Sequence, residues 1–113
     1  MAEKREGEPF TRIDVHEAKE MIDAGDVQVI DSREPHEHHD GHVPGSLQIQ
    51  HMATLVQADK IARDRPVIFI CKSGQRSAVA AEFAAALGIE DIYNVEGGHD
   101  AWQAAGYPME TED

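Results

Sequence analysis

Five short apolar runs alternate with polar or helical segments along this chain, and this alternation constrains its fold more than any other feature. The runs are residues 10–13, 27–30, 47–49, 67–70 and 92–95. Short runs rich in Val, Ile and aromatic residues are typical of strands. Strands that alternate with helices favour a parallel sheet covered by helices. We therefore predict an α/β fold with a mostly parallel sheet.

Four segments between the runs have helical patterns. They are residues 14–24, 51–62, 77–87 and the segment that follows residues 97–98. Asp14 is a suitable N-cap for the first helix, and Gly25 is a suitable stop. The remaining stretch, residues 31–46, is predicted to be a long polar connection.

The length of the chain, 113 residues, indicates one domain with a single core. Residues 1–8 are polar and charged, and we expect a flexible N-terminal segment there. Residues 9–109 should form the domain, and residues 110–113 an acidic tail. A single domain of this size is expected to carry one active surface.

The charge of the chain is strongly acidic, with 22 Asp and Glu residues against 10 Lys and Arg residues and a formal net charge of −12. Nucleic acid is therefore not an expected partner. A charge of this size keeps a small domain soluble and favours a monomer. Composition alone does not separate a high-salt habitat from ordinary acidic solubility.

Two further features bear on location. No run approaches the roughly 18 apolar residues that a membrane span needs, and the first residues lack the apolar segment of a secretory signal. The single cysteine cannot form an internal disulfide, and a lone thiol stays usable most easily in a reducing compartment. We expect a cytoplasmic protein with no membrane contact.

The only cysteine, Cys71, directly follows the apolar run 67–70 and opens a loop that leads into a helix. A thiol in this position faces backbone N–H groups and the positive end of the helix dipole. The pKa of Cys71 should therefore lie below that of an ordinary thiol. Gly74 suits the loop because it tolerates positive φ, and Ser77 is placed to cap the following helix.

Four motifs, in order and in register over residues 9–109, resemble those of rhodanese domains. They are Asp31-Ser-Arg33-Glu34; Gly41-His-Val-Pro-Gly-Ser46; the loop from Cys71 to Ser77; and Glu96-Gly-Gly98 with Ala101-Trp102 and Gly106-Tyr-Pro108. Four motifs in register are far more specific than one short pattern. The resemblance implies a rhodanese-like three-layer fold, with a mostly parallel five-stranded sheet and helices on both faces.

The resemblance also implies sulfurtransferase chemistry of the thiosulfate sulfurtransferase type. Cys71 would take a sulfane sulfur from thiosulfate or another persulfide donor and hold it as a covalent persulfide, with no other cofactor. The acceptor would be cyanide, a small thiol or a protein thiol. Without a second domain, the site should be open to solvent and to protein acceptors.

The loop after Cys71 is the predicted substrate-binding segment. Its members are Lys72, Ser73, Gly74, Gln75, Arg76 and Ser77. Their backbone N–H groups can point toward the sulfur and stabilise a thiolate or a persulfide. Lys72 and Arg76 would give the rim positive charge, which matters because thiosulfate is a dianion approaching an acidic protein.

Five other residues are predicted to have structural roles near the site. They are Asp31, Arg33, His42, Gly97 and Gly98. By resemblance, Asp31 and Arg33 brace the domain through an ion pair, and His42 lies in a turn common to the family. The glycine pair permits a tight turn beside the loop. His99, which follows the pair, is expected at the surface.

A cluster of histidines between residues 36 and 42 raises the question of a metal site. Its members are His36, His38, His39 and His42. No cysteine is near them, and their spacing fits no familiar site. We therefore predict no metal. We expect solvated side chains at His36, His38 and His39 on the polar connection, whereas His42 lies in the turn that the family shares.

Two alternatives to a sulfurtransferase enzyme stay open. The domain could be a relay or binding module that carries persulfide between protein partners with little turnover of its own. It could also resemble phosphatases whose catalytic cysteine and arginine bracket a phosphate-binding loop. Those enzymes have five intervening residues, whereas four residues separate Cys71 from Arg76, and the smaller cradle favours a single sulfur over a phosphate.

Overall fold

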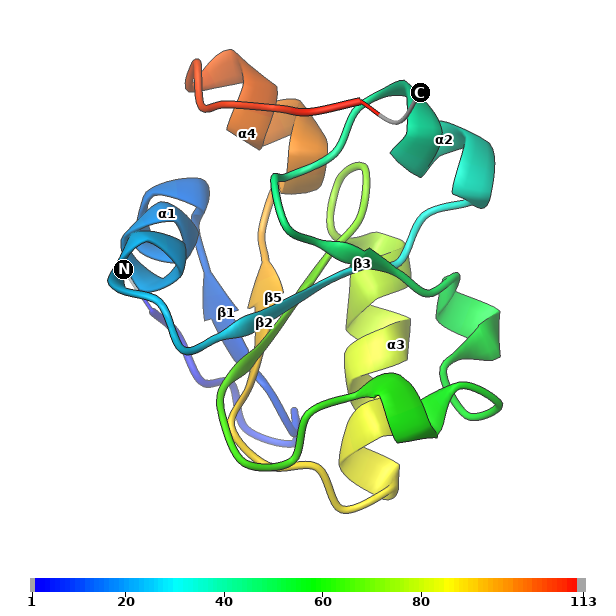
Figure 1. The fold of residues 1–113 in the computed structure, drawn as a ribbon. Helices are drawn as coiled ribbons and strands as arrows, with labels where there is room; N and C mark the ends of the chain where they lie inside the picture. The colour runs from blue at the N-terminus through cyan, green and yellow to red at the C-terminus, as the bar shows by residue number, and fades with distance from the viewer. Residues whose placement is uncertain (1, 112–113) are drawn as a thin grey trace.

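The strands of the computed structural model, which describes residues 2–111, form one sheet in the order β1-β5-β4-β2-β3 (Figure 1). They are β1 (Thr11–Ile13), β2 (Gln28–Asp31), β3 (Leu47–Gln48), β4 (Val67–Ile70) and β5 (Ile92–Val95). All neighbouring pairs in this sheet are parallel. The predicted five-stranded parallel sheet is confirmed, and β4 is its central strand.

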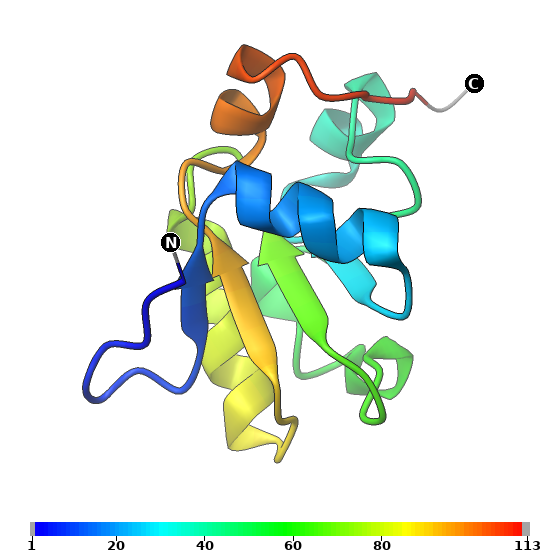
Figure 2. The same ribbon diagram turned by 90° about the vertical axis from the view of Figure 1, so that its left-hand side faces the viewer.

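Helices lie on both faces of the sheet, as predicted. The α-helices are α1 (Val15–Ala24), α2 (Pro35–Asp40), α3 (Gln75–Ala86) and α4 (Gly98–Ala104). Helix α1 covers one face and α3 covers the other (Figure 2). Helices α2 and α4 lie beyond the arrowheads of the strands, at the edge of the sheet where parallel α/β proteins place their ligand sites.

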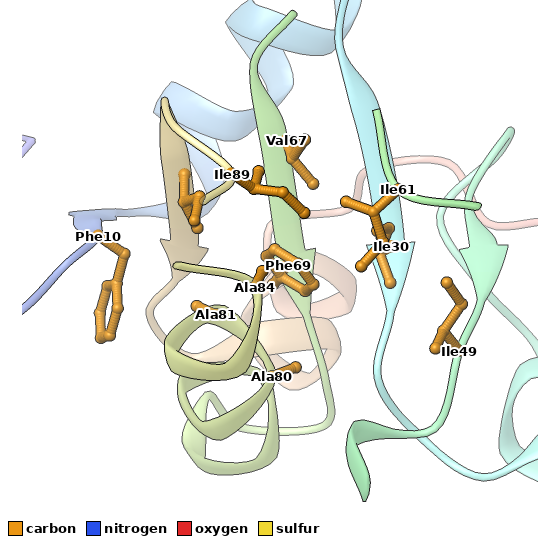
Figure 3. Packing of buried hydrophobic residues seen from close by; sticks show 11 residues of the cluster. Phe10, Ile30, Ile49, Ile61, Val67, Phe69, Ala80, Ala81, Ala84 and Ile89 are labelled. Atoms are coloured by element: carbon orange, nitrogen blue, oxygen red, sulfur yellow. The ribbon is translucent and has the colours of Figure 1, made fainter. Parts of the chain in front are cut away.

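Burial on both faces of β4 explains its uninterrupted apolar sequence. Val67 and Phe69 belong to the apolar cluster on the α3 side, which Figure 3 shows, whereas Ile68 and Ile70 belong to the cluster on the α1 side. Each of these side chains is at most 1% exposed. Complete burial of one such side chain contributes about 1.5–3 kcal/mol. The strand that leads to Cys71 is therefore anchored by apolar packing on both of its faces.

Helix α1 has the ends that the sequence predicts. The Asp14 carboxylate accepts a hydrogen bond from the Glu17 N–H at 2.8 Å, and the Glu17 carboxylate accepts one from the Asp14 N–H at 3.0 Å. This reciprocal arrangement satisfies backbone donors that the first turn leaves without a partner. The helix ends at Gly25, where φ is +82°.

The structure corrects the predicted helices in three places. Helix α2 lies within the stretch that was predicted to be a polar connection, and Pro35 begins it at a position where proline is favourable. The helical region predicted for residues 51–62 consists of two 3₁₀ turns, His51–Ala53 and Ala58–Lys60. Helix α3 begins at Gln75, two residues before the predicted start, because Gly74 is its N-cap.

Both ends of the described chain pair with the domain. The backbones of Glu3 and Arg12 exchange two hydrogen bonds of 2.7 Å, and those of His42 and Glu110 exchange two of 2.9 Å. These contacts lie outside the boundaries expected at residues 9 and 109, and the flexibility of residues 1–8 stays a prediction. None of the helices between residues 2 and 111 is long and apolar enough to cross a membrane.

Candidate functional site

Cys71 lies where the central strand β4 ends, and Gly74 is the N-cap of α3 three residues later. The backbone turns within this short distance because Gly74 adopts φ of +111°. A Cβ at Gly74 would also lie 3.5 Å from the Val95 carbonyl oxygen and 3.6 Å from the Gly97 nitrogen. The structure therefore confirms the predicted strand, loop and helix around Cys71, and it places the loop close to the end of β5.

Donors from the loop and from the first turn of α3 surround the Cys71 sulfur. The Gly74 N–H donates to Sγ at 3.1 Å, and the Ser77 hydroxyl donates to Sγ at 3.3 Å. Cys71 is 1% exposed and Ser77 is fully buried, so little water competes for the sulfur. A site of this kind stabilises negative charge on sulfur with donors that need not reorganise.

The pKa of Cys71 is set by opposing effects. Burial raises it, whereas hydrogen bonds from the Ser77 hydroxyl and from the backbone N–H groups of Ser77, Gly74 and Ser73 lower it. The hydrogen bonds outweigh burial, and the pKa lies below that of an ordinary thiol. The direction agrees with the expectation from the sequence, because a low pKa makes more thiolate available as nucleophile.

Ser77 has a different role from the predicted one. Gly74 is the N-cap of α3, and Ser77 lies inside the first turn with its hydroxyl directed at Cys71. The same hydroxyl donates to Oδ1 of Asn94 at 2.5 Å. Because a hydroxyl has one proton, it can serve the sulfur or the amide oxygen, but not both fully.

Asn94 is a site residue that the sequence analysis missed. It lies on β5 and is 1% exposed. Besides accepting the Ser77 hydroxyl, its Nδ2 donates to the carbonyl oxygen of Gly74 at 3.1 Å. The sequence held one signal for this role, because Asn94 is the only amide in the otherwise apolar or aromatic run 92–95. A buried amide needs hydrogen-bond partners.

The first turn of α4 holds the carbonyl groups of the loop. The His99 and Asp100 N–H groups donate to the carbonyl oxygens of Cys71 at 2.8 Å and Lys72 at 3.0 Å. This approach requires Gly98, where a Cβ would lie 2.6 Å from the Lys72 carbonyl oxygen and closer still to that of Cys71. With the carbonyl groups turned to α4, the N–H groups of the loop are free to face the sulfur.

His99 is buried, and the expectation that it lies at the surface was wrong. It is 2% exposed, and its Nδ1 lies 2.9 Å from the Cys71 carbonyl oxygen. Its Nε2 lies 3.3 Å from both the Val43 N–H and Nη2 of Arg33. Burial lowers the pKa of His99. These contacts fit a neutral ring that donates from Nδ1 and accepts at Nε2.

Both cations of the loop are paired with carboxylates, which the sequence analysis did not foresee. Nζ of Lys72 lies 3.0 Å from both carboxylate oxygens of Asp100, at the exposed rim. Arg76 donates to Glu37 of α2 at 2.7 and 3.0 Å. The remaining predicted binding residues, Ser73 and Gln75, are exposed and bonded to each other through their side chains.

Asp31 and Arg33 form the ion pair that resemblance implied. The guanidinium donates to the fully buried carboxylate at 2.9 and 2.7 Å and to the Gly41 carbonyl oxygen at 2.6 Å. Burial raises the pKa of Asp31, but hydrogen bonds from Arg33 and His38 and the positive charge of Arg33 bring it below its usual value. The pair therefore joins the ends of β2 and α2 beside the loop.

Two members of the histidine cluster are buried, and for His38 the expectation of a solvated side chain was wrong. His38 is 8% and His42 is 3% exposed, and their rings stack with centroids 3.7 Å apart. His38 Nδ1 lies 2.9 Å from the Asp31 carboxylate, and helix α2 brings it there. His36 and His39 are exposed as expected. Within residues 2–111 no three His, Cys, Asp or Glu side chains are grouped to hold a metal ion.

The structure predicts that Ser77→Ala raises the pKa of Cys71. The variant removes a hydroxyl that stabilises the thiolate, so the alkylation rate at neutral pH should fall and its inflection should move to higher pH. The measurement is the rate of iodoacetamide alkylation against pH. Ser73→Ala is the control, because its hydroxyl bonds to Gln75 and its contribution to the sulfur comes from the backbone. Equal profiles for both variants would contradict the assigned role of Ser77.

The chain is similar to known proteins over most of its length. A family model for the rhodanese-like domain matches residues 14–105. The chain is 35% identical over 98 residues to Thiosulfate sulfurtransferase GlpE of Pseudoalteromonas translucida, a match that covers 85% of this chain and 91% of that protein.

Solved structures agree with the fold. A rhodanese-related protein from Thermoplasma volcanium matches with a TM-score of 0.81 and 35% identity, over 89% of this chain and 98% of the other. A Rhodopseudomonas palustris protein of unknown function, described as a possible tyrosine phosphatase, matches with a TM-score of 0.72 and 32% identity, over 85% and 78% of the two chains.

Proposed function

The chain belongs to the rhodanese-like domain family and is a rhodanese-type sulfurtransferase, and we propose that it carries sulfur as a persulfide on Cys71, with thiosulfate as one donor. One observation carries the proposal: the buried sulfur accepts hydrogen bonds from the Gly74 N–H and the Ser77 hydroxyl. Donors fixed around a sulfur stabilise both a thiolate and a persulfide anion.

The first half-reaction loads the cysteine. The Cys71 thiolate attacks the outer sulfur of thiosulfate, a new S–S bond forms, and the bond between the two sulfurs of thiosulfate breaks. Sulfite leaves with the electron pair of the broken bond and two negative charges, and the persulfide anion keeps one. Because Cys71 is 1% exposed, a donor can reach the sulfur only if side chains around the loop move aside.

The second half-reaction unloads it. A nucleophile such as cyanide attacks the outer sulfur of the persulfide, thiocyanate leaves, and the Cys71 thiolate is restored with no change in total charge. A small thiol or a protein thiol in its thiolate form can take the same sulfur. The Gly74 and Ser77 donors serve both half-reactions, because each begins or ends with an anionic sulfur at the same place.

The proposal includes partners and surroundings. The protein acts without a cofactor, as a monomer, in a reducing cytoplasm that keeps Cys71 available as a thiol. Its acceptor is cyanide, a small thiol or a protein thiol, and its net charge of −12 disfavours nucleic acid. A relay module that passes persulfide between proteins uses the same Cys71 chemistry and would differ in having little turnover with small substrates.

Phosphate ester hydrolysis is the second candidate, because one structural relative is described as a possible tyrosine phosphatase. Four residues lie between Cys71 and Arg76 in the loop, which leaves less room for a phosphate and its three terminal oxygens. Arg76, which would have to bind those oxygens, is engaged by Glu37. Sulfur transfer is therefore the function that the geometry supports best.

Intact mass spectrometry tests the proposal. After treatment with thiosulfate, the protein should gain the mass of one sulfur atom, and cyanide should remove that mass and release thiocyanate. The same preparation should hydrolyse an aryl phosphate far more slowly than it consumes thiosulfate. A protein that shows no sulfur gain, or that hydrolyses the aryl phosphate at a comparable rate, would contradict the proposed function.

A further inference from the structure

Arg76, a cation of the active-site loop, is paired with a carboxylate. Arg76 follows Cys71 by five positions in the sequence, and the charge of Cys71 is among the influences that raise the pKa of Arg76, after its hydrogen bond with Glu37. Both nitrogens at the end of its guanidinium donate to the two oxygens of Glu37, at 2.7 and 3.0 Å. A donor that approaches Cys71 therefore meets a charge pair, rather than one positive charge.

Glu37 is held in this position by its own helix. Its Oε1 also accepts a hydrogen bond from the Glu34 N–H at 3.0 Å, which closes the first turn of α2. The hydrogen bond with Arg76 lowers the pKa of Glu37 to about 2, against the effect of partial burial. The carboxylate is therefore ionised throughout the neutral range. Its side chain is 23% exposed and that of Arg76 is 28% exposed, so water screens the pair only in part.

We propose that Glu37 is a specificity-determining residue, which makes this site favour sulfane-sulfur donors with one negative charge over dianionic donors such as thiosulfate. The inference rests on the proposed function and names the donor class of the same site. It assigns a role to Glu37, a residue of α2 that lies outside the loop from Cys71 to Ser77. Glu37 acts through Arg76, and it is a positioning residue rather than a catalytic one.

Two physical reasons support this role. A guanidinium binds two oxygens through parallel N–H groups, and Glu37 already occupies the pair that would bind two oxygens of thiosulfate. The negative charge of Glu37 also repels a donor in proportion to the charge of that donor. The repulsion energy between Glu37 and a dianion is therefore twice that between Glu37 and a monoanion at the same place.

Glu37→Gln tests the inference with two donors that differ mainly in charge. Thiosulfate is a dianion, and methanethiosulfonate carries a methyl group in place of one charged oxygen. Both donate their outer sulfur to the Cys71 thiolate, with sulfite or methanesulfinate as the leaving group. The glutamine keeps an oxygen that can accept the Glu34 N–H and removes the charge.

The variant should lower the KM for thiosulfate about fivefold and that for methanethiosulfonate about twofold, because the logarithm of a Coulomb effect scales with donor charge. The turnover number at saturation should change little, because the sulfur keeps its own donors, Gly74 and Ser77. Initial rates of sulfite or methanesulfinate release, with cyanide as acceptor, give both constants.

Glu82→Gln is the matched control, because it removes the same charge from an exposed position on α3. It should leave the ratio of the two KM values unchanged. Arg76→Gln should shift that ratio the opposite way, against thiosulfate, because it leaves the Glu37 charge uncompensated. This second variant keeps the test decisive if Glu37→Gln folds poorly. In the double variant, restoring neutrality should bring the ratio back toward that of the wild-type protein.

Two failures are distinguishable. In the first, wild-type Cys71 gains sulfur from thiosulfate, but Glu37→Gln, like Glu82→Gln, leaves the ratio of the KM values for thiosulfate and methanethiosulfonate unchanged. The specificity inference is then wrong, and the sulfurtransferase function stands. If wild-type Cys71 gains no sulfur from either donor, the proposed persulfide function is wrong as well.

Discussion

Cys71→Ser is expected to lower the turnover number at least about a thousandfold, because a serine hydroxyl at neutral pH supplies almost no anion to attack sulfur. The substitution keeps the shape of the side chain. It also keeps an acceptor for the Gly74 N–H and the Ser77 hydroxyl, so the fold should persist. The measurement is thiocyanate formation from thiosulfate and cyanide by purified wild-type and variant proteins.

Stability and covalent loading separate loss of the nucleophile from loss of the fold. A buried exchange of sulfur for oxygen with its hydrogen bonds retained should change the free energy of unfolding by no more than about 1.5 kcal/mol. Chemical denaturation followed by circular dichroism measures that quantity. A well-folded variant that retained a tenth of wild-type turnover would show that the sulfur is not carried by Cys71.

The sheet could be predicted from the sequence because its strands are short, apolar and regularly spaced. The run 67–70 is buried on both sides and therefore has no polar interruption, and Asp14 with Gly25 marks the ends of the first helix by local chemistry alone. These signals lie within a few residues of the element that they predict. The strand order depends on contacts between distant segments, and resemblance, rather than periodicity, implied the complete architecture.

Helix α2 was missed because it has six residues and no apolar stripe. Its signals are Pro35 at the start and the carboxylates of Glu34 and Glu37, which alternate with histidines and resemble an ordinary polar connection. The helix buries His38, whose partner Asp31 lies seven residues away and at the end of a strand. Burial of a polar ring is set by such a partner, which the local sequence does not reveal.

The sulfur and its loop could be located from the sequence, whereas the residues that hold them could not. Gly74 was found because its backbone conformation is needed within the loop itself. Asn94, His99 and Glu37 reach the loop from three other elements, β5, α4 and α2. Arg76 looks like a free cation in the sequence, because its partner Glu37 lies 39 positions away.

Among substitutions at residues other than Cys71, Gly98→Ala should cause the largest loss of stability and turnover. A Cβ at this position would lie 2.6 Å from the Lys72 carbonyl oxygen and closer still to that of Cys71, where backbone cannot yield easily. Helix α4 would have to move away, which breaks the hydrogen bonds from the His99 and Asp100 N–H groups. We expect a loss of about 2–4 kcal/mol in unfolding free energy, from overpacking and from positive φ together.

In Gly98→Ala, the loop should lose its orientation toward the sulfur even in molecules that stay folded. When the carbonyl groups of Cys71 and Lys72 lose their donors on α4, the loop amides no longer have a fixed direction toward the sulfur. The pKa of Cys71 should rise, and turnover should fall about tenfold or more even in the molecules that remain folded. Iodoacetamide alkylation against pH and thiocyanate formation measure these two effects, well below the unfolding temperature.

Gly106→Ala is the matched control, because Gly106 also has positive φ, +78°, but nothing lies within 4 Å of the position of a Cβ. It should cost about 1–2 kcal/mol through backbone strain alone and leave alkylation and turnover unchanged. The difference between the two variants isolates the close approach of α4 to the loop. If both lose the same stability and keep the same Cys71 reactivity, contact with α4 does not orient the loop, and the loop sequence alone must hold its amides toward the sulfur.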